Sequence, residues 1–292
     1  MCKKIFPIEM SKAQGYGKVD KNLQQLIDSG HDILVVSDLN LTVEQFQKAA
    51  DHFKEIYYFD HHLPSAEIEE IFGEQEGIYI YYSDRMSASG ILHQYAKRND
   101  YELDNSLTML CIMTDVYDMW RTDHKLWDDG YKLNDLFWKN GFWGFESQFE
   151  DGFHGFTRED VEYCQEIKQK RIDIIEESPT DLTKDEKGVV ILLTDRQAVN
   201  DVSLYFNAKY DGHFSAYYIV VRDGENYNCS VRLTNEDYDA NEALKTCLEK
   251  HPKIIVSGGG HKMAGGFQFS PKINIDNVFK YIKSVLHETL VS

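Results

Sequence analysis

The chain has 292 residues, of which 42% are hydrophobic and 27% are charged. This balance is typical of a folded globular protein of one or two domains and excludes a disordered or fibrous chain. Lys and Arg number 31 against 49 Asp and Glu, which gives a formal net charge of −18. Such a charge argues against binding along a long nucleic acid duplex, which requires many phosphate contacts. It is compatible with a short phosphorylated substrate, because a divalent cation held by carboxylates reverses the local field.

The sequence contains no apolar run long enough to span a bilayer, and Met1–Pro7 lacks the features of a secretory signal. We therefore expect a cytoplasmic protein with no membrane partner. The cysteines are odd in number, far apart and in no C-x-x-C pair, which disfavours a disulfide framework and a thiolate zinc site. We expect buried, reduced thiols at Cys2, Cys111, Cys164, Cys229 and Cys247.

The first half of the chain alternates between predicted helices and short apolar strands. The strands are predicted at Ile33–Val36, Ile56–Phe59 and Ile78–Tyr82. The helices are predicted around Lys21–Ser29, from Thr42 as N-cap to about Phe53, from about Ala66, and over Met86–Lys97. This order predicts a parallel α/β sheet, whose ligands bind at the carboxyl ends of the strands.

Residues 105–156 are predicted to be mostly helical, and they contain all four tryptophans of the chain. Aromatic side chains in such a segment could stack on nucleobases. We favour the alternative that they pack in a core or between domains. Thr157–Asp160 is typical of a capped helix start and leads into a charged helix that ends before Ser178-Pro179. We interpret this helix as a linker.

After the linker the pattern predicts a second, smaller α/β domain. A strand at Gly188–Leu193 is followed by a hairpin that joins Phe214–Arg222 to Tyr227–Leu233 through Asp223-Gly224. A helix at Ala240–Lys250, strands at Lys253–Val256 and Phe267–Ser270, and a helix from about Ile275 complete this half. The predicted domains are therefore residues 1–156 and 181–292, joined by the helical linker 157–180.

Two polar segments follow predicted strands in the first domain. Asp38 comes directly after the first strand, and Asp60-His61-His62 comes after the second. An aspartate in such a place is commonly a turn or capping residue, and two adjacent histidines can lie in an ordinary surface loop. Imidazole nitrogen combined with carboxylate oxygen is, however, a ligand set that suits manganese, iron or zinc.

A glycine-rich segment, Ser257–Lys262, follows the predicted strand Lys253–Val256. Three consecutive glycines let backbone N–H groups approach an anion closely, and the following His261 and Lys262 can donate to phosphate oxygens. A flexible structural turn is the alternative. The run Gly-Gly-Gly-His is rare by chance in a chain with 19 Gly and 11 His.

The combination of Asp60-His61-His62 with the run Gly258–His261 resembles the DHH/DHHA1 phosphoesterase superfamily. This superfamily includes RecJ-type exonucleases, oligoribonucleases and cyclic-dinucleotide phosphodiesterases. Asp38 is similar to the family's second motif, and Asp118 in Tyr117-Asp118-Met119-Trp120 is similar to the fourth. The form of this fourth motif most resembles the nanoRNase B branch.

The resemblance implies a manganese-dependent phosphodiesterase acting on a short oligoribonucleotide or related small nucleotide. Its metal ligands would be Asp38, His61 and Asp118, with Asp115 as the alternative to Asp118. Asp60 would support these ligands from close by, and His62 would contact the scissile phosphate. The residues implied to hold another phosphate or terminus of the substrate, across a cleft between the domains, are Arg232, Gly258, Gly259, Gly260 and His261. Considered alone, Arg232 is an ordinary ion-pair partner.

The family's first motif, a His-x-Asp-x-Asp-Gly segment, does not occur before Asp38. Met1–Pro7 resembles the end of the helix that follows this motif, Ile8 onward the second strand, and Tyr16–Asp20 the loop after it. The chain is therefore expected to begin about two dozen residues late. In the two-metal site of the family, one metal would keep most of its ligands and the other would lose most of them. An exposed sheet edge would reduce stability or favour a homo-oligomer.

A late start, a truncation and a degenerate paralogue all account for the missing motif. A degenerate paralogue would be a catalytically impaired nucleotide-binding or regulatory protein. A further alternative keeps the enzyme but changes its substrate to a single-stranded DNA end or a cyclic nucleotide. The motifs do not distinguish among these substrates.

Overall fold

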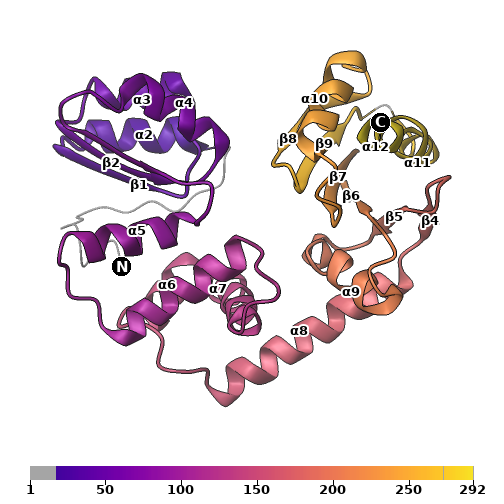
Figure 1. The fold of residues 1–292 in the computed structure, drawn as a ribbon, viewed down its shortest axis with the longest axis horizontal. Helices are drawn as coiled ribbons and strands as arrows, with labels where there is room; N and C mark the ends of the chain where they lie inside the picture. The colour runs from indigo at the N-terminus through magenta and orange to yellow at the C-terminus, as the bar shows by residue number, and fades with distance from the viewer. Residues whose placement is uncertain (1–17, 272, 292) are drawn as a thin grey trace. The chain divides into compact units, whose positions relative to one another are not determined.

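The computed structural model describes residues 18–271 and 273–291, which form two compact units, one up to Cys164 and one from Gln165 (Figure 1). The helix and strand expected between Met1 and Tyr16, and the thiol of Cys2, lie outside the described residues. The predicted α/β class is confirmed, with a parallel sheet in the first unit and a second sheet in the other. None of the helices within these residues is both long enough and apolar enough to cross a bilayer.

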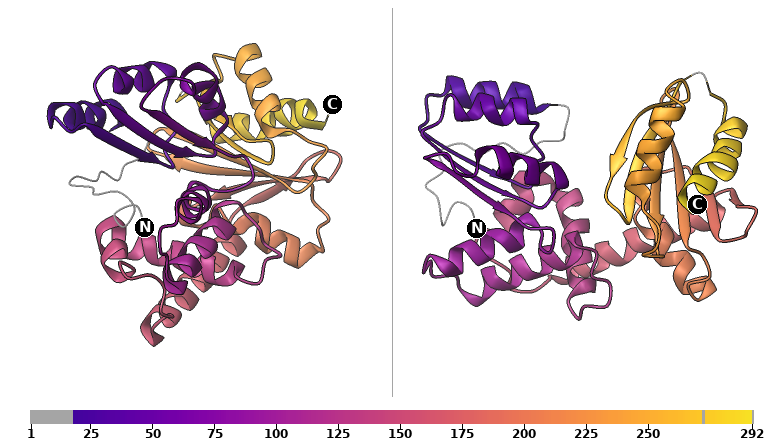
Figure 2. Two further views of the ribbon diagram at one scale, coloured as in Figure 1. Left: turned by 60° about the vertical axis from the view of Figure 1, so that its left-hand side comes forward. Right: turned by 45° about the horizontal axis from the view of Figure 1, so that its top comes forward.

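The first unit is built on a three-stranded parallel sheet in the order β1-β2-β3. Its strands are β1 (Ile33–Ser37), β2 (Glu55–Asp60) and β3 (Ile78–Tyr82). Its helices are α2 (Val19–Asp28), α3 (Val43–Ala50), α4 (Leu63–Phe72), α5 (Ala88–Arg98), α6 (Asn105–Asp118) and α7 (Trp127–Gln148). Helices α2, α3 and α4 cover one face of the sheet and α5 covers the other (Figures 1 and 2).

The strand side chains alternate between these two helical layers. Val36 and Tyr58 belong to the core shared with α2, α3 and α4, whereas Phe59 packs with Ile91 of α5. Burial on both faces explains why the strands are continuous apolar runs in the sequence. The predicted N-cap Thr42 accepts a hydrogen bond from Gln45 N, and the Gln45 side chain accepts one from Thr42 N, which forms a capping box.

The helical part of the first unit is less continuous than predicted. Helix α7 is interrupted at Gly141, where φ is +65°. It ends at Gln148, and residues 150–156 are not helical. Within the aromatic segment, Phe149 is buried, whereas Trp138 and Trp143 are 76% and 60% exposed.

The second unit contains a six-stranded mixed sheet in the order β4-β5-β6-β7-β9-β8. Its strands are β4 (Thr180–Leu182), β5 (Gly188–Leu193), β6 (Ala216–Asp223), β7 (Asn226–Leu233), β8 (Ile255–Gly260) and β9 (Ala264–Phe269). Its helices are α8 (Arg158–Glu177, which begins before Gln165), η2 (Arg196–Ala198), α9 (Asp201–Tyr210), α10 (Ala240–Lys250), α11 (Ile275–Tyr281), the π-helical η3 (Ile282–Leu286) and α12 (His287–Val291). One face of the sheet packs on α10, α11 and α12, and the other on α9 and the end of α8.

The hairpin predicted through Asp223-Gly224 is present as β6 and β7, with Gly224 at φ +61°. The strand predicted at Lys253–Val256 was wrong in its extent, because β8 begins at Ile255 and continues through Gly260. The three glycines are therefore part of a strand: Gly259 and Gly260 face Gly266 and Gly265 of β9, and Gly258 faces Phe267. Strand β4 and helix α9 were not predicted.

A buried histidine connects the last helix of the second unit to its sheet. His287 is 3% exposed, and its Nδ1 lies 2.7 Å from the Tyr218 hydroxyl. Its Nε2 lies 3.0 Å from both carboxylate oxygens of Asp185. Both ring nitrogens of His287 are therefore in hydrogen-bonding contact. Partial burial alone would raise the pKa of Asp185, but hydrogen bonds from Thr183 and His287 hold it well below its ordinary value.

Because the pKa of Asp185 is lowered on folding, its ionised form stabilises the folded state above the ordinary aspartate pKa of about 4. The contribution is lost as the pH falls below that value. We expect Asp185→Asn to lower Tm at pH 7 and the difference from the wild type to narrow at pH 3, as measured by thermal melts. The neighbouring, exposed Glu186→Gln should show no such pH-dependent difference; an equal response of both variants would contradict the assignment.

Candidate functional site

The candidate site lies at the carboxyl edge of the parallel sheet in the first unit. Asp38 follows β1 and His61 follows β2, and the pairing of Ser37 with Phe59 brings the two strand ends to the same level. Asp38 has φ +57°, a left-handed conformation that is uncommon outside glycine. Its N–H donates to Phe59 O at 3.0 Å, which fixes this turn against β2. The sheet therefore holds Asp38 and His61 beside each other.

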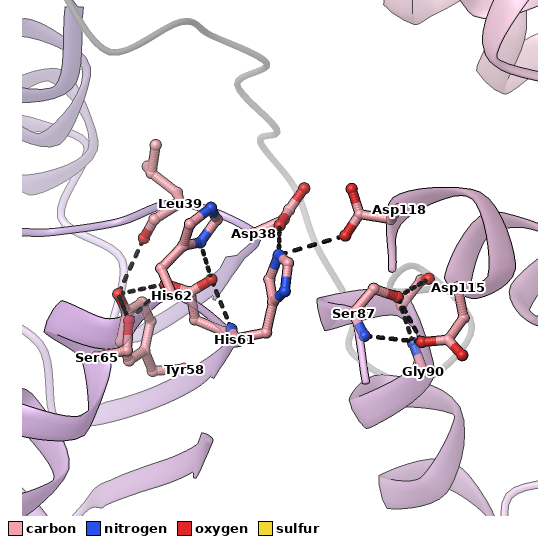
Figure 3. Close-up of polar contacts among 12 residues, drawn as sticks. Asp38, Leu39, Tyr58, His61, His62, Ser65, Ser87, Gly90, Asp115 and Asp118 are labelled. Atoms are coloured by element: carbon pink, nitrogen blue, oxygen red, sulfur yellow. Dashed lines mark hydrogen bonds and ion pairs between the residues drawn. The ribbon is translucent and has the colours of Figure 1, made fainter. Parts of the chain in front are cut away.

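His61 stands between two carboxylates (Figure 3). Its Nε2 lies 3.3 Å from Asp38 Oδ1 and 3.3 Å from Asp118 Oδ2. The imidazole is 12% exposed, while the Asp38 and Asp118 side chains are 54% and 38% exposed. The ring of His61 is thus largely buried, whereas the carboxylates of Asp38 and Asp118 remain accessible from solvent.

The imidazole and the two carboxylates of this cluster shift one another's pKa values. Burial alone would lower the pKa of His61, but the hydrogen bond to Asp38 and the charge of Asp118 raise it overall. Partial desolvation by the surrounding side chains, followed by the like charge of Asp38, raises the pKa of Asp118 to about 6. Carboxylates whose ionised forms repel each other are stabilised by a cation placed between them.

The donor set fits a divalent cation. Ligand atoms of Asp38, Asp60, His61 and His62 lie within 4.8 Å of one another, and Asp118 adds a carboxylate next to His61. Separations of 3.3 Å between the imidazole nitrogen and the two carboxylate oxygens match ligands that share one cation at bonds of about 2.1 Å. Two carboxylates and one imidazole suit a hard to borderline cation such as manganese.

Asp60 is fully buried and is held by donors from its own strand and loop. Its Oδ1 accepts from His61 N at 2.9 Å and lies 2.7 Å from His62 Nδ1. Its Oδ2 accepts from Ser65 Oγ at 2.5 Å and lies 3.1 Å from the Tyr58 hydroxyl. Burial alone would raise the pKa of Asp60, but the hydrogen bonds from His62 and Ser65 lower it. Asp60 is therefore an ionised anchor for the loop that carries both histidines.

Tyr58 and Ser65 are two members of the site that sequence reasoning missed. The Tyr58 hydroxyl lies 3.0 Å from Leu39 O and accepts from Leu41 N at 3.3 Å, so it also ties down the loop after β1. Tyr58 could have been found from its spacing in the sequence. It precedes Asp60 by two residues, and side chains two residues apart lie on the same face of a strand such as β2.

Of the two aspartates proposed for the fourth motif, the structure places Asp118 beside His61. Asp115 instead accepts a hydrogen bond from Ser87 N at 2.7 Å and pairs with Arg121 at 2.7 Å. Its side chain is 10% exposed.

The other predicted residues lie in the second unit, at one end of the sheet. Arg232 on β7 pairs with Ala264 on β9, and the His261 N–H donates to Ala264 O at 2.7 Å in the turn between β8 and β9. The Arg232 guanidinium donates to Val231 O at 3.0 Å and to Asn200 Oδ1 at 3.2 Å. Arg232 and His261 are thus brought together through β9, and Asn200 is a further contact that the sequence did not indicate.

The three glycines of β8 differ in what the fold requires of them. A Cβ at Gly258 would lie 2.7 Å from Phe267 Cβ, and one at Gly260 would lie 2.3 Å from Gly265 Cα. A Cβ at Gly259 would meet nothing within 4 Å, and Gly259 has no positive φ. Packing therefore explains Gly258 and Gly260, whereas the fold itself accepts a side chain at Gly259.

Residues 182–288 match the DHHA1 domain family. An exopolyphosphatase-related protein from Bacteroides fragilis shares the fold at a TM-score of 0.53 and 16% identity, over 94% of this chain and 76% of that protein. The second unit therefore carries a DHHA1 domain, and the fold of the chain is similar to that of the exopolyphosphatase-related protein. The match confirms the DHHA1 part of the resemblance inferred from the motifs.

Two further solved structures are similar at lower TM-scores. RecJ from Thermus thermophilus, in complex with Mg²⁺, is 14% identical at a TM-score of 0.41, over 98% of this chain and 54% of that protein. The pGpG-specific phosphodiesterase PggH from Vibrio cholerae is 12% identical at a TM-score of 0.34, over 88% and 97%. Comparison with curated proteins gives no match.

The difference between the glycines gives a test of which of them the fold requires. Gly259→Ala should leave Tm unchanged or slightly raised, because the alanine fits and restricts the unfolded chain. Gly260→Ala should lower Tm by several degrees, equivalent to about 1–3 kcal/mol of overpacking. Equal melting temperatures for the two variants would contradict the conclusion that packing requires Gly260 but not Gly259.

Proposed function

We propose that this protein is a metal-dependent phosphodiesterase that hydrolyses short oligoribonucleotides or a related small nucleotide. The observation that carries the proposal is the convergence of Asp38, His61 and Asp118 around one imidazole nitrogen at the carboxyl edge of a parallel sheet. The DHHA1 match over residues 182–288, together with the DHH-like motifs of the first unit, supports a phosphoesterase type of hydrolysis.

Asp38, His61 and Asp118 would hold the cation, which we propose to be Mn²⁺. When bound, the cation would supply Lewis acidity and lower the pKa of a water molecule. His61 is well placed as a ligand because its ring is largely buried and its Nε2 faces both carboxylates. Its backbone N–H is fixed by Asp60, so the ligand is positioned from both ends.

His62 would contact the scissile phosphate. Its Nδ1 lies 2.7 Å from the buried Asp60 carboxylate, which orients the ring. In the second unit, Arg232 and the turn at His261 would bind another phosphate or the terminus of the substrate. A guanidinium suits this role because it donates to phosphate in a planar fork.

The overall charge limits the length of the proposed substrate. At −18 the chain repels long polyanions, whereas a substrate of a few nucleotides needs only the local cation and the arginine. A short oligoribonucleotide is therefore favoured over a long strand.

The proposal is tested by incubating the protein with the diribonucleotide pApA and Mn²⁺ and separating the products by chromatography. We expect release of mononucleotides. His61→Ala should reduce turnover by at least about a hundredfold, because it removes the nitrogen that both carboxylates face. His52→Ala is the matched control, since His52 is exposed and its Nδ1 lies against Lys48 O.

Turnover that survives in His61→Ala would refute the assignment of the site. Tight nucleotide binding without turnover at any Mn²⁺ concentration would refute the enzyme and favour a nucleotide-binding protein. Parallel reactions with a single-stranded DNA dinucleotide and a cyclic nucleotide would show which substrate is preferred.

A further inference from the structure

Asp118 is the last residue of α6, so its distance from His61 depends on how α6 is held against the sheet. Helix α5 lies between them, packing on β2 through Ile91 and Leu92 against Phe59, and contacting α6 on its other side. The apolar contacts along α5 set the general position of α6. They do not by themselves fix the end of α6 that carries Asp118.

A polar junction fastens that end of α6 to the start of α5 (Figure 3). Asp115 Oδ1 accepts from Ser87 N at 2.7 Å and from Ser87 Oγ at 3.0 Å. Asp115 Oδ2 accepts from Arg121 Nη1 at 2.7 Å, and Arg121 Nη2 donates to Arg85 O at 2.7 Å. One carboxylate and one guanidinium therefore join the loop after β3, the start of α5 and the end of α6.

Gly90 makes room for this junction. A Cβ at Gly90 would lie 2.6 Å from Asp115 Oδ1 and 3.2 Å from Met86 Cβ. Gly90 lies in the first turn of α5, so any side chain there would push the carboxylate away from Ser87. The sequence thus keeps a helix-disfavouring residue where Asp115 approaches.

Asp115 and Asp118 are three positions apart on one helix, so they are neighbours on the same face. Fixing the carboxylate of Asp115 fixes the rotation of the last turn of α6, and with it the direction of Asp118. We propose that Asp115 is a positioning residue that sets Asp118 at ligating distance from His61. This inference rests on the proposed function, because it gives Asp118 its role as a metal ligand.

The alternative is that Asp115 is itself a ligand. Its two oxygens receive three donated hydrogen bonds, and its side chain is 10% exposed. A cation would have to displace Ser87 and Arg121 to reach it. Asp118 already lies 3.3 Å from His61, so a cation that binds to both does not have to displace Ser87 or Arg121.

The test is the affinity for Mn²⁺, measured by calorimetry on the full chain. Asp115→Asn, Gly90→Ala and Arg121→Lys each disturb the junction, and each should raise Kd by about tenfold. Arg121→Lys keeps the positive charge but loses the fork that joins Asp115 to Arg85. If Asp115 were a ligand, loosening its ion pair in Arg121→Lys would tighten Mn²⁺ binding, so the two roles predict opposite changes.

Asp160→Asn is the matched control. Asp160 is also a buried aspartate of the first unit, and its Oδ2 accepts from Thr157 N and Thr157 Oγ at the start of α8. This variant should lose thermal stability like Asp115→Asn but keep the wild-type Kd. A wild-type Kd in Asp115→Asn and Gly90→Ala, or tighter binding in Arg121→Lys, would overturn the inference.

Failure of the proposed function is recognised separately: the wild type would then give no turnover of pApA, and failure of the metal site itself would appear as no binding of Mn²⁺ to the wild type. In that case a crystal structure of Gly90→Ala, grown without metal, still tests the inference. The separation between Asp118 and His61 should exceed the 3.3 Å of the wild type. An unchanged separation would overturn the inference whatever the function.

Discussion

The arrangement of the first unit depends on the buried carboxylate of Asp60. A charge without exposure to water is tolerated only if its oxygens are hydrogen-bonded, and Asp60 satisfies this with groups from its own strand and the following loop. The same bonds fix His61 through its backbone and His62 through its ring. Tyr58 extends the network to Leu39 and Leu41, so the loop that begins with Asp38 is held by the same anchor. Stability and site geometry therefore rest on one set of contacts.

The site combines two kinds of structural support. Asp38 and His61 are placed by neighbouring parallel strands, whose register is specified by the side chains buried on both faces. Asp118 is placed by a helix that contacts the sheet by way of α5. The ends of hydrogen-bonded strands are held firmly by their neighbours. The end of α6 has no such neighbour and needs a local contact to fix the direction of Asp118. The polar contacts of Asp115 with Ser87 and Arg121 provide that connection.

Much of the fold follows from patterns that the sequence displays directly. The strands of the first sheet are short apolar runs that end in polar residues, so both their position and the location of Asp38 and Asp60–His62 could be predicted. Helix α9 was missed because its exposed Tyr210 and buried Asp201 obscure any single apolar face. The extent of β8 was missed because glycine is depleted in strands, and the sequence does not show that Gly259 and Gly260 face Gly266 and Gly265 of β9. The choice between Asp115 and Asp118 depends on Ser87 and Arg121, contacts that spacing alone does not reveal.

The contacts of α12 also bear on the order in which the second unit folds. His287 is joined to Asp185 across 102 positions of the chain, and Lys283 is joined to Asp181 across the same interval. In the first unit, by contrast, each strand pairs with the next one along the chain across a single helix. Long-range contacts form slowly because a long loop must close first. During synthesis, the first sheet can assemble as its strands emerge, whereas the second unit must wait for its final helix before His287 can close it.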